Sequence, residues 1–356
     1  MALDFIRPTI RDMQGYAPGE QPAAGERVVK LNTNENPFPP SPRVVQAIRE
    51  MEPEMLRRYP DPNAVSFCNA AAKIHDISSD MILTGNGSDD ILAIAVKIFL
   101  GPGDTLAVPH PTYSLYPVLA ELDEVKFTTI DWDRDWSLPI DGLLAAKPRA
   151  IFLANPNAPS GTMVSPLKLE ELAQKFKGLL LIDEAYVDFA DDNCLPLVKK
   201  YENIVISRTL SKAYSLAGLR FGYAVAQPAV IKEMNKAKDS YPNDALSIVA
   251  ATAAIEDQEY ARKSWDHVKA ERQRVSSELT QMGWKILPSQ TNFILAATPS
   301  GNGKAAYQGL KQQGILVRFF NKPGLSDKIR ITIGTSQENN ALLAGLKALS
   351  ATEKAA

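Results

Sequence analysis

The chain has 356 residues, enough for one large hydrophobic core and a smaller second one, because single cores stop growing at about 250–300 residues. Hydrophobic residues make up 45% of the chain and charged residues 22%, as in ordinary globular proteins. The net charge of −2 provides no basic surface for nucleic acid, so we expect a small-molecule ligand instead.

We expect neither a signal peptide nor a membrane span. The first residues, MALDFIRPTIRDM, include acidic residues, and no segment approaches the ~20 apolar residues that cross a bilayer. The cysteines, Cys68 and Cys194, are far apart and outside any C-x-x-C spacing, which fits a reducing compartment and thus the cytoplasm. The histidines are also far apart, and we expect no metal site: His75, His110 and His267.

The order of apolar and polar segments predicts three parts. Residues 1–42 are rich in proline and polar residues and are expected to form an irregular N-terminal arm. In residues 43–245, runs of Ile, Leu and Val alternate with helical patterns, which is typical of a buried, mostly parallel sheet. Residues 247–282 are charged and amphipathic, and we expect one long helix there. Residues 246–356 as a whole predict a small α+β domain.

A glycine-rich turn, Gly85-Asn-Gly-Ser-Asp-Asp90, follows a strand-like run and opens a helix. Such a helix N-terminus directs backbone N–H groups and the positive end of the helix dipole at an anion, so Ser88 and Asp89 are candidate phosphate-binding residues. An ordinary capped helix is the alternative. The spacing is not G-x-G-x-x-G, which speaks against a nicotinamide dinucleotide.

Two loops follow expected strands, where ligands bind in open α/β sheets. The loop His110-Pro-Thr-Tyr-Ser-Leu-Tyr116 places Tyr113 where its ring could stack on a planar cofactor, and a core tyrosine is the alternative. The loop Asn155-Pro-Asn-Ala-Pro-Ser-Gly161 could hold an asparagine amide near a phenolate oxygen, and a bare turn is the alternative.

Asp183 directly follows four apolar residues at the expected mouth of the sheet. An isolated buried carboxylate is costly, so it must be paired or functional. Its natural partner is a protonated pyridine nitrogen, which makes the ring an electron sink for a carbanion at the substrate. Tyr186 could donate to the 3-hydroxyl oxygen of the same ring. A Walker-B-like Asp-Glu pair is the competing interpretation, but the sequence lacks a P-loop.

Lys212 lies in the segment SRTLSKAYSLAGLRFGY, with Thr209 and Ser211 before it and Arg220 eight positions later. A lysine amine becomes a Schiff-base nucleophile when burial or a neighbouring cation lowers its pKa, and pyridoxal phosphate is the commonest aldehyde bound in this way. The hydroxyls and the guanidinium would bind the cofactor phosphate. A surface lysine in a serine-rich turn is the alternative.

Two arginines, Arg318 and Arg330, lie within apolar, strand-like runs. A guanidinium buried there needs an anion, which could be a substrate carboxylate or phosphate. A structural ion pair explains either arginine equally well.

Eight motifs in sequence order make the chain resemble the fold-type-I pyridoxal-phosphate aminotransferases, and among them the branch that acts on histidinol phosphate: LNTNENPFPP, RYPDP, GNGSDD, HPTYSLY, NPNAPSG, DEAY, SRTLSKAYSLAGLRFGY and IRITIGT. The resemblance implies an α/β fold whose large domain has a mostly parallel seven-stranded sheet between helices, followed by a smaller α+β C-terminal domain. The boundaries expected here are 1–42 for the arm, 43–245 for the large domain and 246–356 for the small domain.

The resemblance also implies a role for each motif residue. Lys212 would form the Schiff base and move the proton, with Asp183 on the pyridine nitrogen and Tyr186 on the 3-hydroxyl oxygen. The other residues implied to bind the cofactor are Gly87, Ser88, Asp89, Tyr113, Asn157, Thr209, Ser211 and Arg220, with Tyr59 from a second subunit. The substrates would meet Tyr16, Asn34, Arg318 and Arg330. A homodimer with shared sites follows from the resemblance as well.

The chain departs from the family in one loop. Many members have N-P-N-N-P-T-G, and the residue before the second proline contacts the 3-hydroxyl oxygen; here that residue is Ala158. We expect Asn157 to take over the contact, with Tyr186 acting alone as the alternative.

The implied reaction is transamination of L-histidinol phosphate with 2-oxoglutarate, which gives imidazole-acetol phosphate and L-glutamate and runs in reverse in histidine biosynthesis. An aromatic-amino-acid aminotransferase and a threonine-phosphate decarboxylase on the same scaffold are the alternatives. A non-catalytic regulator fused to a DNA-binding module is disfavoured, because the chain has no room for an added helix-turn-helix domain and no basic patch.

Overall fold

The structure is a computed structural model that describes residues 4–23, 25 and 27–355. Seven strands form a large sheet in the order β2-β8-β7-β6-β5-β3-β4, in which β8 is antiparallel to both neighbours and the other pairs are parallel. Its strands are the apolar runs seen in the sequence: β2 (Ile82–Gly85), β3 (Thr105–His110), β4 (Lys126–Asp131), β5 (Ala150–Ala154), β6 (Leu179–Asp183), β7 (Ile204–Thr209) and β8 (Gly222–Val225). The predicted mostly parallel sheet is confirmed.

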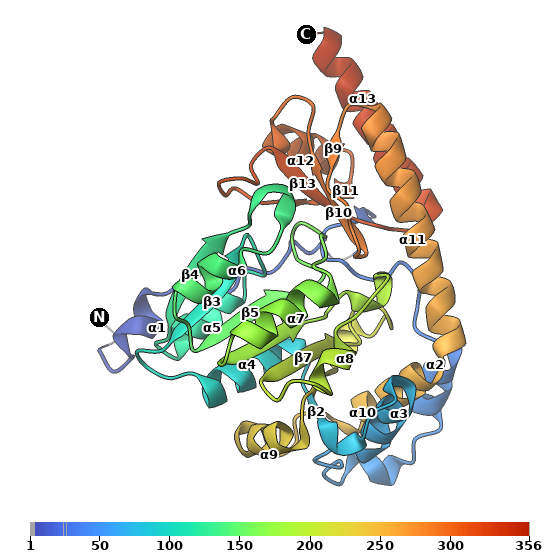
Figure 1. The fold of residues 1–356 in the computed structure, drawn as a ribbon. Coiled ribbons are helices and arrows are strands. Elements are labelled where there is room, and N and C mark those ends of the chain that lie inside the picture. Colours follow the sequence, from blue (N-terminus) through green and yellow to red (C-terminus); the bar gives the residue numbers. More distant parts are fainter. Residues whose placement is uncertain (1–3, 24, 26, 356) are drawn as a thin grey trace.

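Helices cover both faces of the large sheet (Figure 1). In β5, Ala150 and Phe152 pack on one face, and Ile151 and Leu153 pack on the other. The first face is covered by α4 (Ser88–Phe99), α5 (Tyr116–Leu122) and α9 (Pro228–Ala237), and the second by α6 (Ile140–Ala145), α7 (Pro166–Lys175) and α8 (Leu195–Val198). A sheet buried on both sides leaves the ends of its strands for ligand binding.

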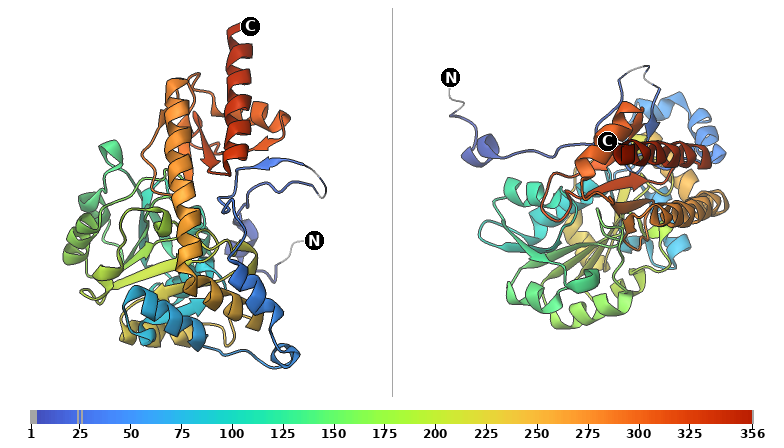
Figure 2. Two further views of the ribbon diagram at one scale, coloured as in Figure 1. Left: turned by 90° about the vertical axis from the view of Figure 1, so that its right-hand side faces the viewer. Right: turned by 90° about the horizontal axis from the view of Figure 1, so that it is seen from above.

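A smaller, antiparallel sheet of four strands follows, in the order β12-β13-β10-β9. The elements of this part are β9 (Lys285–Ile286), β10 (Phe293–Ala297), α12 (Gly303–Gln312), β12 (Arg318–Phe319), β13 (Lys328–Thr332) and α13 (Ser336–Ala355). The last helix packs along α11 (Gln258–Gln281), as Figure 2 shows. The predicted small α+β domain is confirmed.

The single helix expected over residues 247–282 is wrong, because the structure breaks it into α10 (Ala245–Glu256) and α11. The break is Asp257, whose backbone has φ −94° and ψ 61°. Its carboxylate accepts a hydrogen bond from Ser41 Oγ and lies 3.8 Å from Arg43 Nε, at the start of α2 (Pro42–Arg49). Aspartate has a low helix propensity, because its side chain forms hydrogen bonds more readily in non-helical conformations. The contacts with Ser41 and Arg43 therefore stabilise the non-helical backbone at Asp257.

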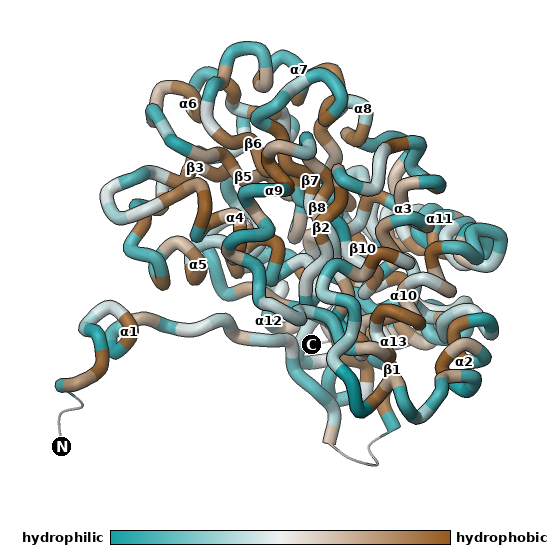
Figure 3. The backbone as a smooth tube through the Cα atoms, turned by 90° about the horizontal axis from the view of Figure 1, so that it is seen from below, coloured by the Kyte–Doolittle hydropathy of each residue, from teal (hydrophilic) through white to brown (hydrophobic). Residues whose placement is uncertain are grey.

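The N-terminal arm is more ordered than expected. It contains α1 (Pro8–Asp12) and the short strand β1 (Val29–Lys30), which pairs in parallel with β11 (Ile315–Leu316). Figure 3 shows α1 at the end of an extended segment, where Arg7 donates a hydrogen bond to the Leu122 carbonyl at the end of α5. The arm therefore extends from α5, which covers the large sheet, to β11 in the C-terminal part of the chain.

Within the described residues, no helix combines the length and the apolar character that a bilayer crossing requires.

Candidate active site

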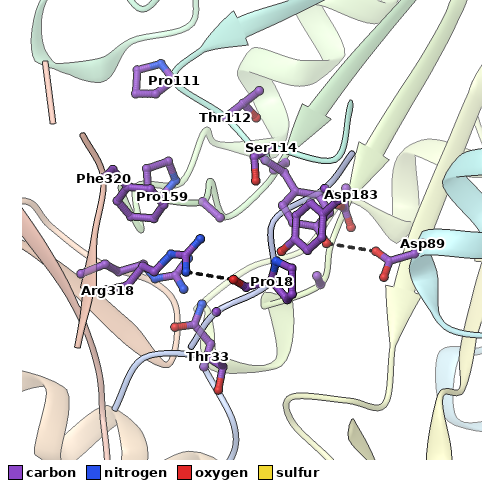
Figure 4. A pocket seen from close by; sticks show the side chains of 18 of the residues that line it. Pro18, Thr33, Asp89, Pro111, Thr112, Ser114, Pro159, Asp183, Arg318 and Phe320 are labelled. Atoms are coloured by element: carbon purple, nitrogen blue, oxygen red, sulfur yellow. Dashed lines mark hydrogen bonds between the residues drawn. The ribbon is translucent and has the colours of Figure 1, made fainter. Parts of the chain in front are cut away.

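A pocket of about 430 Å³ lies where β5, β6 and β7 end, between the large sheet, the N-terminal arm and the C-terminal strands (Figure 4). Most of the residues expected in a site line it: Tyr16, Asn34, Ser88, Asp89, Tyr113, Asp183, Tyr186, Thr209, Ser211, Lys212, Arg220, Arg318 and Arg330. Gly87, Asn157 and Tyr59 are outside this lining. The pocket thus unites motifs that are up to about 300 residues apart in the chain.

Lys212 follows β7 and extends its amine into the pocket. Its Nζ donates a hydrogen bond of 3.1 Å to the Thr33 carbonyl of the arm and lies 6.0 Å from the centre of the Tyr186 ring. Burial and then the nearby Arg330 guanidinium lower the pKa of the Lys212 amine to about 8. More neutral amine is therefore present near neutral pH than an ordinary lysine provides, as a nucleophile or a base requires.

Asp183 ends β6 and is buried. Its Oδ2 accepts a hydrogen bond of 3.0 Å from the Tyr116 hydroxyl, whereas its Oδ1 has no partner among the described residues. Burial raises the pKa of this carboxyl to about 7. An unpaired buried acceptor in the pocket wall suits a cationic N–H donor, such as a pyridinium nitrogen.

A cluster of hydroxyl and guanidinium groups lies at the N-terminus of α4. Arg220 Nη1 donates to Ser211 Oγ at 3.4 Å, and the Thr209 hydroxyl donates to the same oxygen at 3.0 Å. Arg220 Nη2 also lies 3.2 Å from Asp89 Oδ2. With the first-turn N–H groups of α4, these side chains form a cradle for a phosphate. The Asp89 carboxylate itself is directed to Arg220, so it positions that arginine rather than the anion.

Gly87 precedes this cradle with a φ of +85°, and a Cβ atom there would lie 2.7 Å from Arg220 Nη2. The positive φ favours glycine at this position, and the missing side chain leaves the Arg220 guanidinium undisturbed.

The Tyr113 side chain is fixed by a hydrogen bond through its hydroxyl and by contacts of its ring. Its hydroxyl donates a hydrogen bond of 3.1 Å to Asp89 Oδ1, and its ring meets the edge of Tyr116 with 5.6 Å between centres. Tyr16 of the arm approaches the same ring at 6.1 Å and 64°. A fixed aromatic ring on one wall of the pocket can stack on a planar cofactor.

Tyr186 and Asn34 are joined in the pocket, where Asn34 Nδ2 donates a hydrogen bond of 2.9 Å to the Tyr186 hydroxyl. This bond leaves the Tyr186 proton available for another acceptor.

The structure departs from the expectation for Asn157. Its Nδ2 donates to the Pro111 carbonyl at 3.2 Å and to Ser160 Oγ at 2.8 Å, and the side chain does not line the pocket. The small side chain of Ala158 lines it instead. Both hydrogen bonds of the amide nitrogen lie inside the loops, so in this orientation the Asn157 amide is not directed into the pocket.

The two arginines occupy the part of the pocket formed by the C-terminal strands. Arg330 Nη2 donates to the Asn32 carbonyl at 3.1 Å, and its buried Nε has no partner among the described residues. Arg318 donates to the Pro18 carbonyl (Figure 4) and to the Ala17 carbonyl. Within the described part of the chain neither guanidinium has a carboxylate partner, so the pocket offers two cations to an external anion.

Tyr59 does not reach this pocket. Its side chain is 81% exposed and stacks on Tyr241 at 4.4 Å and 15°. Within one chain it therefore has no part in the site.

Two contributors were missed by sequence reasoning. Tyr116 binds Asp183, and the only signal for it was its position three residues after Tyr113, on the same face of a turn. Thr33 binds Lys212 through a backbone carbonyl, which no sequence motif indicates.

Comparisons with known proteins agree with this geometry. The family described as aminotransferase class I and II matches residues 26–346. Histidinol-phosphate aminotransferase 1 of Trichormus variabilis is 43% identical over 346 residues, covering 97% of this chain and 99% of that protein. Histidinol-phosphate aminotransferase of Syntrophotalea carbinolica is 42% identical over 344 residues, covering 97% of this chain and 99% of that protein.

Solved structures show the same fold. The crystal structure of histidinol-phosphate aminotransferase from Sinorhizobium meliloti in complex with pyridoxal-5'-phosphate has a TM-score of 0.88 and 26% identity, covering 98% of this chain and 99% of that one. L-threonine-O-3-phosphate decarboxylase from Porphyromonas gingivalis has a TM-score of 0.77 at 21% identity, covering 90% of this chain and 99% of that one, which bears on the fold alone. The expected fold class is confirmed.

Proposed function

Since the chain belongs to the family of class I and II aminotransferases, we propose that it uses pyridoxal phosphate to transfer an amino group between L-histidinol phosphate and 2-oxoglutarate. The products are imidazole-acetol phosphate and L-glutamate, and histidine biosynthesis uses the reverse direction. One observation carries the proposal: a single pocket unites a low-pKa lysine, an unpaired buried carboxylate oxygen and an unpaired buried guanidinium nitrogen, in a chain 43% identical to a histidinol-phosphate aminotransferase.

The residues present fit the cofactor at each of its polar groups. Asp183 Oδ1 would accept the ring N–H, and the cradle of Ser211 and Arg220 at the N-terminus of α4 would bind the phosphate. Lys212 would bind the aldehyde, and Tyr186 would donate to the 3-hydroxyl oxygen. When bound, the cofactor supplies a ring that withdraws electrons from the carbon bearing the substrate amino group.

Lys212 carries out the proton transfer in this proposal. Its neutral amine can accept the proton from the substrate carbon and return it one position away, because burial and Arg330 keep its pKa at about 8. The Thr33 carbonyl, 3.1 Å from Nζ, orients the amine within the pocket.

Arg318 and Arg330 would bind the anionic end of each substrate in turn. Histidinol phosphate presents a phosphate and no carboxylate, whereas glutamate presents a carboxylate, and a guanidinium fork accepts both. The unpaired Nε of Arg330 supports this role, since a buried donor without an acceptor is costly until an anion binds.

We further propose a homodimer in which Tyr59 reaches the cofactor phosphate of the neighbouring subunit. Exposed apolar side chains in the chain segments around Tyr59 and its stacking partner Tyr241 support this assembly, because exposed apolar surface marks interfaces: Met55, Leu56, Val65 and Leu246. We also propose that the chain consists of an arm (1–42), a large domain (43–245) and a small domain (246–356).

A cytoplasmic location is proposed as well. The two cysteines are buried and free, which supports a reducing compartment.

The test adds L-histidinol phosphate to the cofactor-loaded protein and follows the cofactor absorbance, then adds 2-oxoglutarate and measures glutamate. We expect an absorbance change and conversion of the cofactor to its amine form with histidinol phosphate alone, and glutamate after the second addition. With Lys212→Ala we expect neither the amine form nor glutamate, because the proton transfer needs the Lys212 amine. Absence of both in the native protein would overturn the proposal. Phenylalanine and phosphothreonine, the latter with detection of carbon dioxide, would reveal an aromatic aminotransferase or a decarboxylase.

A further inference from the structure

Tyr116 is the first residue of α5 and one of the most deeply buried side chains, with 0% of its surface exposed. Its hydroxyl donates a hydrogen bond of 3.0 Å to Asp183 Oδ2. Asp183 is in the pocket lining and Tyr116 is not, so the tyrosine contacts the carboxylate from the protein interior and not from the pocket. The oxygen that remains unpaired, Oδ1, is the one left for a ligand.

The Tyr116 ring is fixed on two sides. It meets Tyr113 edge to face at 5.6 Å and 86°, and Phe152 edge to face at 5.7 Å and 85°. A side chain clamped in this way holds its hydroxyl at one position, and the carboxylate bonded to it loses the freedom to turn.

The same contacts connect the two ends of the proposed cofactor site. Arg220 in the phosphate cradle bonds to Asp89, Asp89 accepts from the Tyr113 hydroxyl, and the Tyr113 ring packs on Tyr116. Tyr116 then bonds to Asp183. The distance between the anion-binding group and the ring-nitrogen acceptor is thus set by a continuous series of packed side chains.

We propose that Tyr116 is a positioning residue, which orients Asp183 so that Oδ1 faces the ring nitrogen of pyridoxal phosphate and keeps the carboxylate ionised for that contact. This inference rests on the proposed function, because it presupposes that cofactor. Burial raises the pKa of the Asp183 carboxyl, and the Tyr116 hydrogen bond opposes that rise. Loss of the hydroxyl would leave a larger neutral fraction, which binds a pyridinium more weakly.

The experiment uses Tyr116→Phe, which removes the hydroxyl and keeps the ring. Dissociation constants are measured by fluorescence titration of the cofactor-free protein with pyridoxal phosphate and with its 1-deaza analogue, whose ring has carbon in place of the nitrogen. We expect the variant to bind pyridoxal phosphate about tenfold more weakly and the deaza analogue unchanged, because one charge-assisted hydrogen bond is affected. Equal losses for both ligands, or no loss for either, would overturn the inference.

Tyr223→Phe is the matched control. This buried tyrosine bonds to His75 at 2.8 Å through its hydroxyl and packs on the opposite face of the large sheet, outside the pocket. We expect its affinities for both ligands to equal those of the native protein.

A double-mutant cycle with Asp183→Asn separates positioning from general damage to the fold. If Tyr116 acts through Asp183, adding Tyr116→Phe to Asp183→Asn causes no further loss of pyridoxal-phosphate affinity; a further tenfold loss contradicts the inference. Failure of the native protein to bind pyridoxal phosphate would instead refute the proposed function, so the two failures are distinguishable.

Discussion

An acceptor and a donor in the same pocket, Asp183 Oδ1 and Arg330 Nε, are buried and have no partner among the residues that the structure describes. Each unpaired buried group costs about 1–3 kcal/mol, so these two atoms lower the free energy of unfolding of the cofactor-free protein. A bound cofactor and a bound anion would satisfy one atom each. Burial, and then the charge of the Arg330 guanidinium, also lowers the pKa of the Lys212 amine.

The pKa of Lys212 predicts a specific pH dependence in the cofactor-free protein. Because burial and Arg330 disfavour the ammonium form, acetylation of Lys212 should increase with pH around a midpoint near 8. Replacement of Arg330 by Gln removes a neighbouring cation and should move the midpoint to higher pH. Competitive labelling with acetic anhydride and mass spectrometry would measure this, with exposed Lys304 as the internal reference; identical profiles for both lysines would contradict the prediction.

Single residues were predictable from the sequence where a charge ends or interrupts an apolar run, as at Asp183 and Arg330, or lies in a recognisable motif, as at Lys212. A buried charge needs a partner, and a charged residue in an apolar run can be recognised from its neighbours in the sequence. The contact between Tyr116 and Asp183 was not predictable, because it joins residues 67 positions apart through the packing of α5. The position of Asn157 was missed for a related reason: its amide serves the loops around it, which a motif does not reveal.

At the scale of elements, the phosphate cradle depends on the close approach of β8 to the start of α4. A Cβ atom on Gly222 would clash with the backbone of Gly87 and Ser88. Position 222 requires glycine because a larger residue would not fit, and not because the backbone has an unusual φ. Strands such as β8 were predictable from their apolar runs, whereas the break at Asp257 and the pairing of β1 with β11 depend on distant partners.

Gly222→Ala should separate β8 from the phosphate cradle. We expect a decrease of about 1–3 kcal/mol in the free energy of unfolding, as overpacking causes, together with weaker binding of pyridoxal phosphate. Gly218→Ala is the control, since a Cβ atom there meets nothing within 4 Å. Urea denaturation and cofactor titration measure both effects, and equal behaviour of the two variants would refute the explanation.

At the scale of the whole molecule, the pocket is enclosed by three parts of the chain that are far apart in sequence. The arm contributes Thr33, the large sheet Asp183 and Lys212, and the C-terminal strands Arg318 and Arg330. The order of motifs predicted that Asp183 and Lys212 lie together, because the carboxyl ends of neighbouring parallel strands meet at one edge of the sheet. The contribution of Thr33 was not predicted. The exposed Tyr59 belongs to none of these walls, and its proposed role lies in a neighbouring subunit.

Shared sites in a homodimer predict complementation between two defective variants. Lys212→Ala removes the amine from a subunit's own pocket, and Tyr59→Ala removes the proposed contribution to the neighbour's pocket. In a mixed dimer one site carries both defects and the other carries none. After unfolding and refolding an equal mixture, we expect about a quarter of native activity at limiting pyridoxal phosphate, because half of the dimers are mixed and each has one intact site.

Each variant refolded with native protein is the control. If Tyr59 acts within its own chain, no intact site forms, and the mixture would show only half the activity of Tyr59→Ala alone.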